Sequence, residues 1–143
     1  MGALFGPAGN SESFAAMGYK SSLDVPEYVQ KMGLDAFEYQ CGRGVNIGEE
    51  KARQLGTLAA EKGIALSVHA PYYISLASKE EAKRDNSIRY IFESARAVHA
   101  MGGERIVVHP GGLGGLSREQ ATALAGETMR RALERLDSEG LSM

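Results

Sequence analysis

Two short apolar stretches of the chain end in the same way. Residues 64–68 are almost purely apolar and run into His69, and residues 105–108 carry three apolar side chains before His109. A proline follows each histidine within two positions, and proline ends a strand because it has no N–H to donate. Apolar runs of this kind are typical of parallel strands that are buried on both faces. We therefore predict two such strands, each ending at a histidine.

Two further strands are predicted nearer the N-terminus. Residues 2–6 are a short apolar stretch, and residues 34–40 alternate apolar and polar side chains. Such alternation is the pattern of a half-buried strand. Both stretches are followed by loops rich in glycine, which is abundant in this chain at 18 of 143 residues. Glycines gathered at turns indicate many short loops between regular elements.

A helix is predicted after each strand. The first should begin at Asp24, with Pro26 in its first turn and Glu27 completing a capping box, and should end at Gly33. The starts predicted for the other three helices are Asn46 or Gly48, Ser78 with Glu81, and Ser117 with Gln120. The inward faces predicted for these three helices are Ala52, Leu55 and Ala59; Ile88, Ile91, Phe92, Ala95 and Val98; and Ala121, Leu124, Ala125, Thr128, Ala132, Leu133 and Leu136.

Strands that alternate with helices indicate a parallel sheet with right-handed crossovers. The chain holds four strand–helix units, and residues 141–143 look like the start of a fifth strand. These pieces match half of a (β/α)8 barrel, which usually needs about 250 residues. The prediction is therefore an α/β chain of the (β/α)8 TIM-barrel class. Residues 1–143 would form a single partial domain that covers about the first four units and is truncated as the fifth strand begins.

Composition narrows the classes of function. The chain is 43% hydrophobic and 24% charged, which is typical of a soluble globular protein. It has no apolar run approaching the roughly 18 residues of a membrane span, and the first residues lack a signal-peptide pattern. A single cysteine, Cys41, fits a reducing cytoplasm. The net charge of −2 excludes a globally basic nucleic-acid binder, so contacts to phosphate would need a local patch or metal ions.

His69 and His109 are the main candidates for chemistry. The active face of a parallel α/β barrel lies at the C-terminal strand ends, and adjacent strands are only about 4.8 Å apart. Two histidines at matching strand ends could therefore hold one ion, and imidazole is a natural zinc ligand. The alternative is that each histidine simply forms a hydrogen bond at its strand end. His99 lies near the end of the long helix, where the helix dipole explains it without a site role.

Other residues near these strand ends could contact a ligand. Tyr72 could stack on a base or a sugar, or pack beneath its loop. Arg43 lies between two glycines, which suits a phosphate contact, or it is an ordinary exposed arginine. Glu38 could face the site as a base or ligand, or face outward. Cys41 is better explained as a small buried filler, and residues 111–115 form a glycine-rich rim loop without the Lys-Ser/Thr ending of a phosphate-binding loop.

Three segments resemble one known family. Residues 66–78 (LSVHAPYYISLAS) and 105–111 (RIVVHPG) resemble endonuclease IV, the apurinic/apyrimidinic endonuclease family of DNA base-excision repair. Residues 42–46 (GRGVN) look like the second loop of that family's shorter bacterial and archaeal members. The resemblance implies a (β/α)8 barrel that binds three zinc ions at its C-terminal face. It also implies cleavage of DNA 5′ to an abasic site by a metal-activated hydroxide, and it covers only the family's N-terminal half.

The resemblance also implies roles for single residues. His69 and His109 correspond to two ligands of one zinc ion, Tyr72 to a residue that inserts into the DNA near the flipped abasic sugar, and Arg43, loosely, to a loop residue that probes the minor groove. The family's bridging glutamate would fall beyond Met143, and its other ligands come from later strands. Two histidines cannot close a tetrahedral zinc site, so we predict that the chain alone is inactive or nearly so.

Two other functions remain open on the sequence. The first is a sugar-phosphate isomerase or epimerase of the xylose isomerase-like TIM-barrel superfamily, with a divalent metal and a pair of carboxylates, which Glu38 acting as a base would favour. The second is a stable half barrel with no activity of its own. A half barrel exposes its inner face and two sheet edges. We therefore expect the chain to associate with itself through these surfaces. The partner that the endonuclease IV resemblance implies is DNA that contains abasic sites.

Overall fold

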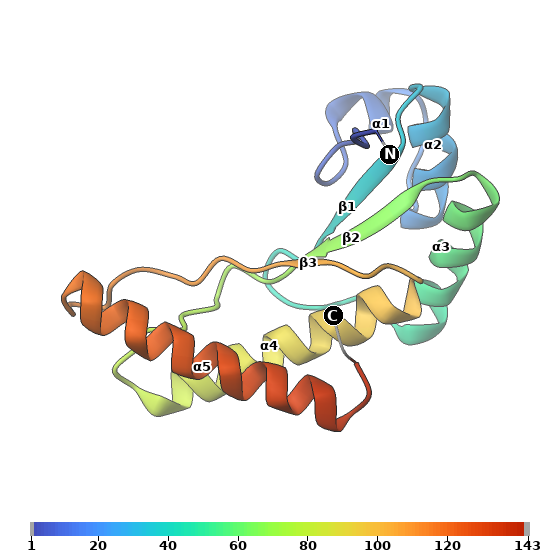
Figure 1. Cartoon of the computed structure of the whole chain (residues 1–143). Coiled ribbons are helices and arrows are strands. Elements are labelled where there is room, and N and C mark those ends of the chain that lie inside the picture. The colour runs from blue at the N-terminus through green and yellow to red at the C-terminus, as the bar shows by residue number, and fades with distance from the viewer. Residues whose placement is uncertain (1, 142–143) are drawn as a thin grey trace.

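A computed structural model of the chain describes residues 2–141 and has the predicted alternation of strands and helices (Figure 1). The elements in chain order are α1 Glu12–Ala16, the 3-10 helix η1 Ser22–Asp24, α2 Val25–Lys31, β1 Ala36–Gln40, α3 Glu49–Glu61, β2 Ala65–His69, α4 Glu81–Ala100, β3 Ile106–Val107 and α5 Arg118–Ser138.

The three strands form one parallel sheet in the order β1-β2-β3. Gln40 at the end of β1 pairs with His69 at the end of β2, and His69 pairs with Val107 of β3. The predicted parallel sheet with helical crossovers is confirmed. The register also brings the C-terminal ends of all three strands to the same edge of the sheet.

The prediction of a strand at residues 2–6 is wrong. The Phe5 carbonyl accepts hydrogen bonds from the Asp35 and Ala36 N–H groups at 2.8 and 3.1 Å, so the segment does lie beside β1. Regular pairing fails because Pro7 has no N–H to donate, and only an isolated bridge, Ala8 to Glu38, remains. The last predicted strand is shortened to Ile106–Val107, and residues 142–143 of the predicted fifth strand lie outside the described residues.

Two of the predicted capping boxes are wrong, although α2 begins directly after Asp24 with Pro26 in its first turn, as predicted. A 3-10 turn precedes α2, so its capping box is formed one turn earlier, by Ser21 and Asp24, and Asp24 does not cap α2 with its side chain. The N-cap of α4 is Glu80, because the Ser78 hydroxyl instead accepts from the Glu80 N–H at 3.2 Å in a local turn. The Gly48 start of α3 and the capping box of α5 are confirmed.

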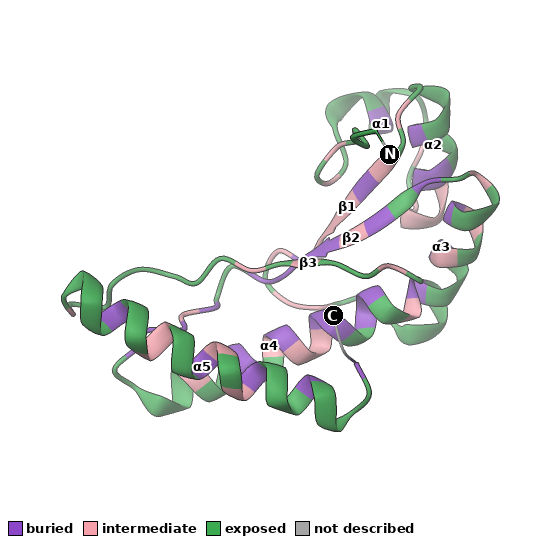
Figure 2. Cartoon of the chain, viewed as in Figure 1, coloured by how far each residue is buried: buried purple, intermediate pink, exposed green. Residues whose placement is uncertain are grey.

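The core consists of two clusters on the helical side of the sheet (Figure 2). The first joins the sheet to α2, α3 and α4 through side chains that include Phe37, Leu55 and Val98. The second lies between α4, α5 and the loop after β2. The predicted inward faces are buried or half-buried with one exception, Leu133 on α5, which is 46% exposed. Leu133 lies off the line of α5 that packs inward, where Ala132 and Leu136 are buried.

The two faces of the sheet differ in chemistry. Alternate positions of β1 and β2, among them Phe37, Leu66 and Val68, are buried against the helices. The positions between them carry Glu38 and Ser67, which are half-buried and face the other way. In a closed barrel this second face would line the interior. None of the helices within residues 2–141 is long and apolar enough to cross a membrane.

Candidate functional site

The parallel sheet brings the two candidate histidines together. His69 is the last residue of β2, and His109 follows β3 by two positions, so both leave the sheet on the same face and at the same edge. Their ring centroids are 4.9 Å apart, with an angle of 35° between the ring planes. His69 is buried and His109 is exposed. The geometry therefore pairs one anchored imidazole with one that is open to solvent.

A hydrogen bond sets the tautomer of His69. Its Nδ1 lies 2.9 Å from the carbonyl oxygen of Ala70. A carbonyl can only accept, so Nδ1 carries a proton, and in the neutral ring Nε2 then keeps its lone pair. This is the arrangement of a metal-binding histidine, whose second nitrogen is usually held by a carbonyl or carboxylate.

The loops that follow β2 and β3 hold each other in place. The Leu76 N–H donates to the Pro110 carbonyl at 2.9 Å, and Gly111 has a φ of +85°, where a side chain would meet the Ile74 carbonyl at 3.0 Å. Only glycine fits this close approach without strain. The Thr128 hydroxyl of α5 also donates to the Leu76 carbonyl at 2.8 Å. These contacts keep the two histidine-bearing strand ends adjacent.

Tyr72 lies at the rim of this pair. Its ring centroid is 5.5 Å from that of His69, and the residue is 63% exposed. Its N–H donates to the Gly42 carbonyl at 3.0 Å. This bond connects Tyr72 to the loop after β1, in which Arg43 is exposed directly beside Gly42. Two side chains that could contact a ligand therefore project from neighbouring loops.

Glu38 lies on the same face as His69, two positions before the end of β1. One of its carboxylate oxygens accepts a hydrogen bond from Gln40 Nε2 at 3.0 Å. The Gln40 side chain, which pairs with His69 in register, was not among the candidates from the sequence. The signal was present, because the alternation in residues 34–40 places Glu38 and Gln40 on one face. Their relation to Tyr72 depends on the strand register.

Cys41 and His99 are not part of this group. Cys41 is 5% exposed, and burial raises the pKa of its thiol to about 11, so it remains protonated and unreactive. This agrees with its predicted role as a buried filler. His99 is exposed in the last turn of α4.

The described residues provide only part of a metal site. No group of three or more His, Cys, Asp or Glu side chains in residues 2–141 is arranged to hold an ion. A tetrahedral zinc site needs four ligands, and His69 and His109 supply two imidazoles. The donor set fits zinc chemically but does not complete a site, so no catalytic step through a metal follows from these residues alone.

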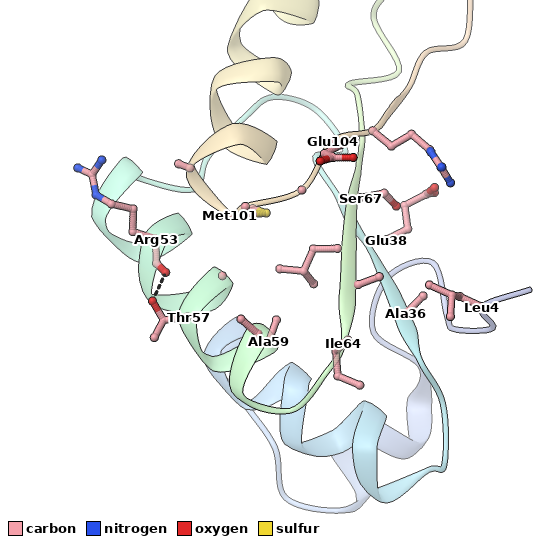
Figure 3. Close-up of a pocket in the computed structure, with 18 of the residues that line it drawn as sticks. Leu4, Ala36, Glu38, Arg53, Thr57, Ala59, Ile64, Ser67, Met101 and Glu104 are labelled. Carbon is pink, nitrogen blue, oxygen red and sulfur yellow. Dashed lines mark hydrogen bonds between the residues drawn. The ribbon is translucent and has the colours of Figure 1, made fainter. Parts of the chain in front are cut away.

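A groove in the described part of the chain lies elsewhere. It has a volume of about 800 Å³ and extends from the N-terminal parts of the strands to the turn between α4 and β3 (Figure 3). Its lining includes Leu4, Ala36, Glu38 and Ser67 but neither His69 nor His109. In parallel α/β barrels the N-terminal strand ends contribute stability and the C-terminal ends contribute chemistry. The histidine edge is therefore the better candidate for a functional site.

Comparison with known proteins identifies the family. Residues 26–143 match the Xylose isomerase-like TIM barrel family. The chain therefore belongs to this family, and its parallel sheet with surrounding helices is part of a TIM barrel, as the sequence predicts. The histidine edge is accordingly the end at which such barrels carry their active sites.

Relatives at the level of sequence include an uncharacterized protein and several probable endonucleases. The chain is 29% identical over 140 residues to an uncharacterized protein of Methanocaldococcus jannaschii, a match that covers 98% of this chain and 48% of the relative. It is 31% identical over 91 residues to a probable endonuclease 4 of Acholeplasma laidlawii, a match that covers 62% of this chain and 31% of that protein.

Similar solved structures include an epimerase-like protein and an endonuclease. A D-tagatose 3-epimerase-like protein superposes with a TM-score of 0.66 at 22% identity, and endonuclease IV from Thermus thermophilus with a TM-score of 0.60 at 22% identity. Each match covers 80% of this chain and 44% of the other chain. At this identity the likeness establishes the fold alone. The chain spans about half the length of the Methanocaldococcus jannaschii relative and of the epimerase-like protein.

Proposed function

We propose that this chain supplies the N-terminal half of a zinc-dependent endonuclease of the endonuclease IV type, which cleaves DNA 5′ to abasic sites. The observation that carries the proposal is the pairing of His69 and His109 at neighbouring strand ends, with centroids 4.9 Å apart. The similarity to probable endonuclease 4 supports it.

Each residue of the site has a role in this proposal. His69, through its free Nε2, and His109 hold one zinc ion. Tyr72 stacks on the nucleotide next to the abasic sugar, since aromatic rings stack on any base. Arg43 contacts the backbone or minor groove, where its planar fork suits phosphate oxygens. Zinc, when bound in a complete site, lowers the pKa of a water molecule and neutralises charge on the phosphate.

We further propose that residues 1–143 act as one partial TIM-barrel domain that needs additional polypeptide for activity. Two imidazoles leave at least two positions of a tetrahedral zinc site to other ligands. The chain alone should therefore bind zinc weakly and should not turn over DNA.

A nicking assay tests this directly. The purified chain, supplied with Zn²⁺, is incubated with an end-labelled duplex that carries one abasic site, and an undamaged duplex is the control. We expect no cleavage above background, with tighter binding to the abasic duplex than to the control. Robust cleavage that EDTA abolishes would contradict the predicted inactivity, and equal affinity for both duplexes would contradict the endonuclease assignment.

Zinc binding by calorimetry tests the two ligands separately from DNA. His69→Ala and His109→Ala should each weaken Zn²⁺ binding at least tenfold, because each removes one of two imidazoles. His99→Ala is the matched control and should leave binding unchanged. Equal zinc affinity in all three variants would show that the ion is not bound by the strand-end pair.

A sugar-phosphate isomerase or epimerase is the second candidate. It is favoured by Glu38, which lies on the same face of the sheet as His69, and a D-tagatose 3-epimerase-like protein shares the fold. The same two measurements separate the candidates. Zinc binding through the histidine pair without preference for abasic DNA would favour the isomerase.

A further inference from the structure

A chain of hydrogen bonds crosses the inner face of the sheet and ends at Tyr72. Gln40 Nε2 donates to a Glu38 carboxylate oxygen at 3.0 Å, and the Tyr72 hydroxyl donates to Gln40 Oε1 at 3.2 Å. We propose that Glu38 and Gln40 are positioning residues that set the orientation of Tyr72 at the rim of the site. The proposal rests on the role in ligand binding that the proposed function assigns to Tyr72.

The chemistry of the three groups gives the chain one direction. A carboxylate has only acceptors, so the amide nitrogen of Gln40 must face Glu38. The amide oxygen then faces Tyr72, and the Tyr72 hydroxyl must donate to it. A carboxylate acceptor also strengthens the first bond relative to a neutral pair. Glu38 thus determines which way the Gln40 amide points, and Gln40 determines where the Tyr72 proton points.

The backbone restricts the same side chains. Gly9 has a φ of +82°, and a side chain there would meet Gln40 Cγ at 2.9 Å, so the N-terminal segment lies directly against Gln40. The Tyr72 N–H bond to the Gly42 carbonyl holds the other end at 3.0 Å. Gln40 is half-buried. The Gln40 side chain therefore lies between Glu38 on β1, the N-terminal segment at Gly9 and the loop that carries Tyr72. It can in this way connect the sheet to the rim.

Two consequences follow for ligand recognition. The Tyr72 proton is directed inward, so the hydroxyl presents lone pairs to the solvent and would accept a hydrogen bond from a ligand hydroxyl or amino group. One oxygen of the Glu38 carboxylate accepts a hydrogen bond from Gln40 Nε2, so Glu38 anchors the rim tyrosine through the Gln40 amide.

NMR on the isotope-labelled chain tests the positioning without a ligand. Glu38→Gln should shift the side-chain amide signals of Gln40, and Gln40→Leu should shift the ring signals of Tyr72 more than those of Tyr73. The matched control is Glu50→Gln on α3, where Glu50 accepts from Gln54 Nε2 at the same 3.0 Å. This control should move the Gln54 amide and leave Gln40 unchanged. Unshifted Gln40 signals in Glu38→Gln, or unshifted Tyr72 signals in Gln40→Leu, would overturn the proposal.

Binding measurements then connect the positioning to the site. The probe is a fluorescein-labelled duplex with a tetrahydrofuran abasic analogue, measured by anisotropy in EDTA. Tyr72→Phe and Gln40→Leu should each weaken binding about three- to tenfold, the range for one hydrogen bond. The double variant should bind the duplex as tightly as the single variant with the lower affinity, because both substitutions break the same hydrogen bond. Glu50→Gln should bind as the unaltered chain does.

The two proposals fail in different ways. If the single variants weaken binding independently, so that their effects multiply in the double variant, Gln40 does not act through Tyr72 and the positioning role is wrong. If the unaltered chain shows no preference for the abasic duplex, the endonuclease proposal fails, and the NMR shifts still decide whether Glu38 and Gln40 orient Tyr72.

Discussion

At the scale of single residues, the histidine-ended strands were readable from the sequence and their geometry was not. An apolar run that stops on a histidine is a local pattern, so His69 and His109 could be named as strand-end residues. The distance between their rings depends on which strands pair and in which register. The same holds for Gln40, whose position opposite His69 follows from the pairing of β1 with β2.

Cys41 offers a test at this scale. Burial raises the pKa of its thiol to about 11, so at pH 8 almost none of it is thiolate, the reactive form. Iodoacetamide should label the folded chain at least 100-fold more slowly than the chain unfolded in guanidinium. The rate should rise about tenfold per pH unit until the pH nears the raised pKa.

The same shift predicts a loss of stability at high pH. The unfolded thiol has an ordinary pKa of about 8.5, so deprotonation favours the unfolded chain once the pH exceeds that value. The contribution of the buried, protonated Cys41 thiol to the free energy of unfolding is fully present below about pH 8.5 and declines as the pH rises toward about 11. Labelling of the folded chain at the rate of a free thiol would show that Cys41 is accessible.

At the scale of elements, the order of strands and helices followed from the periodicity of apolar side chains. The residues at which each element begins and ends depended on the segments next to it. The capping box of α5 was predicted correctly because Ser117 and Gln120 satisfy each other locally. The capping boxes predicted for α2 and α4 were wrong because the Asp24 carboxylate and the Ser78 hydroxyl instead accept hydrogen bonds within the turns that precede these helices. The strand expected at residues 2–6 does not pair regularly with β1, because Pro7, which follows it, has no N–H to donate.

Two glycines inside helices provide a matched prediction. In α3, a Cβ at Gly56 would lie 2.9 Å from Met101 Cα and closer still to its carbonyl, whereas at Gly126 in α5 it would meet nothing within 4 Å. Gly126→Ala should stabilise the fold by roughly 0.5–1 kcal/mol through helix propensity. Gly56→Ala should destabilise it by roughly 1–3 kcal/mol through overpacking.

Urea unfolding of both variants at one temperature checks this pair. The two substitutions have the same propensity term, so the difference between them isolates the contact of α3 with the turn after α4. A stabilising effect of Gly56→Ala equal to that of Gly126→Ala would mean that this contact is looser than the structure indicates.

At the scale of the whole molecule, the sheet does not close on itself within residues 2–141. Exposed apolar side chains lie at both edges: Leu4 and Phe5, at 61% and 65%, beside β1, and Val107, at 38%, on β3. Free strand edges pair readily with other chains, and closure into a barrel removes them. We propose that, without further polypeptide, two copies associate through these edges.

Sedimentation velocity over a range of concentrations tests this association. We expect a concentration-dependent dimer, and Val107→Lys should shift it toward monomer because a charge at an edge opposes pairing. Leu133→Lys, at a similarly exposed position on α5, is the control and should leave the distribution unchanged. A monomer at all concentrations would contradict the proposal.

The sequence by itself determined the succession of elements, the parallel α/β class and the two histidines at strand ends, because these follow from side-chain periodicity within short segments. Only the tertiary structure decided that the first apolar segment is not a regular strand, that the histidine rings are 4.9 Å apart, and that Glu38, Gln40 and Tyr72 are linked. The physical reason is that these relations join residues of different segments. They are set by strand register, by close approaches that only glycine permits, and by the contacts between loops.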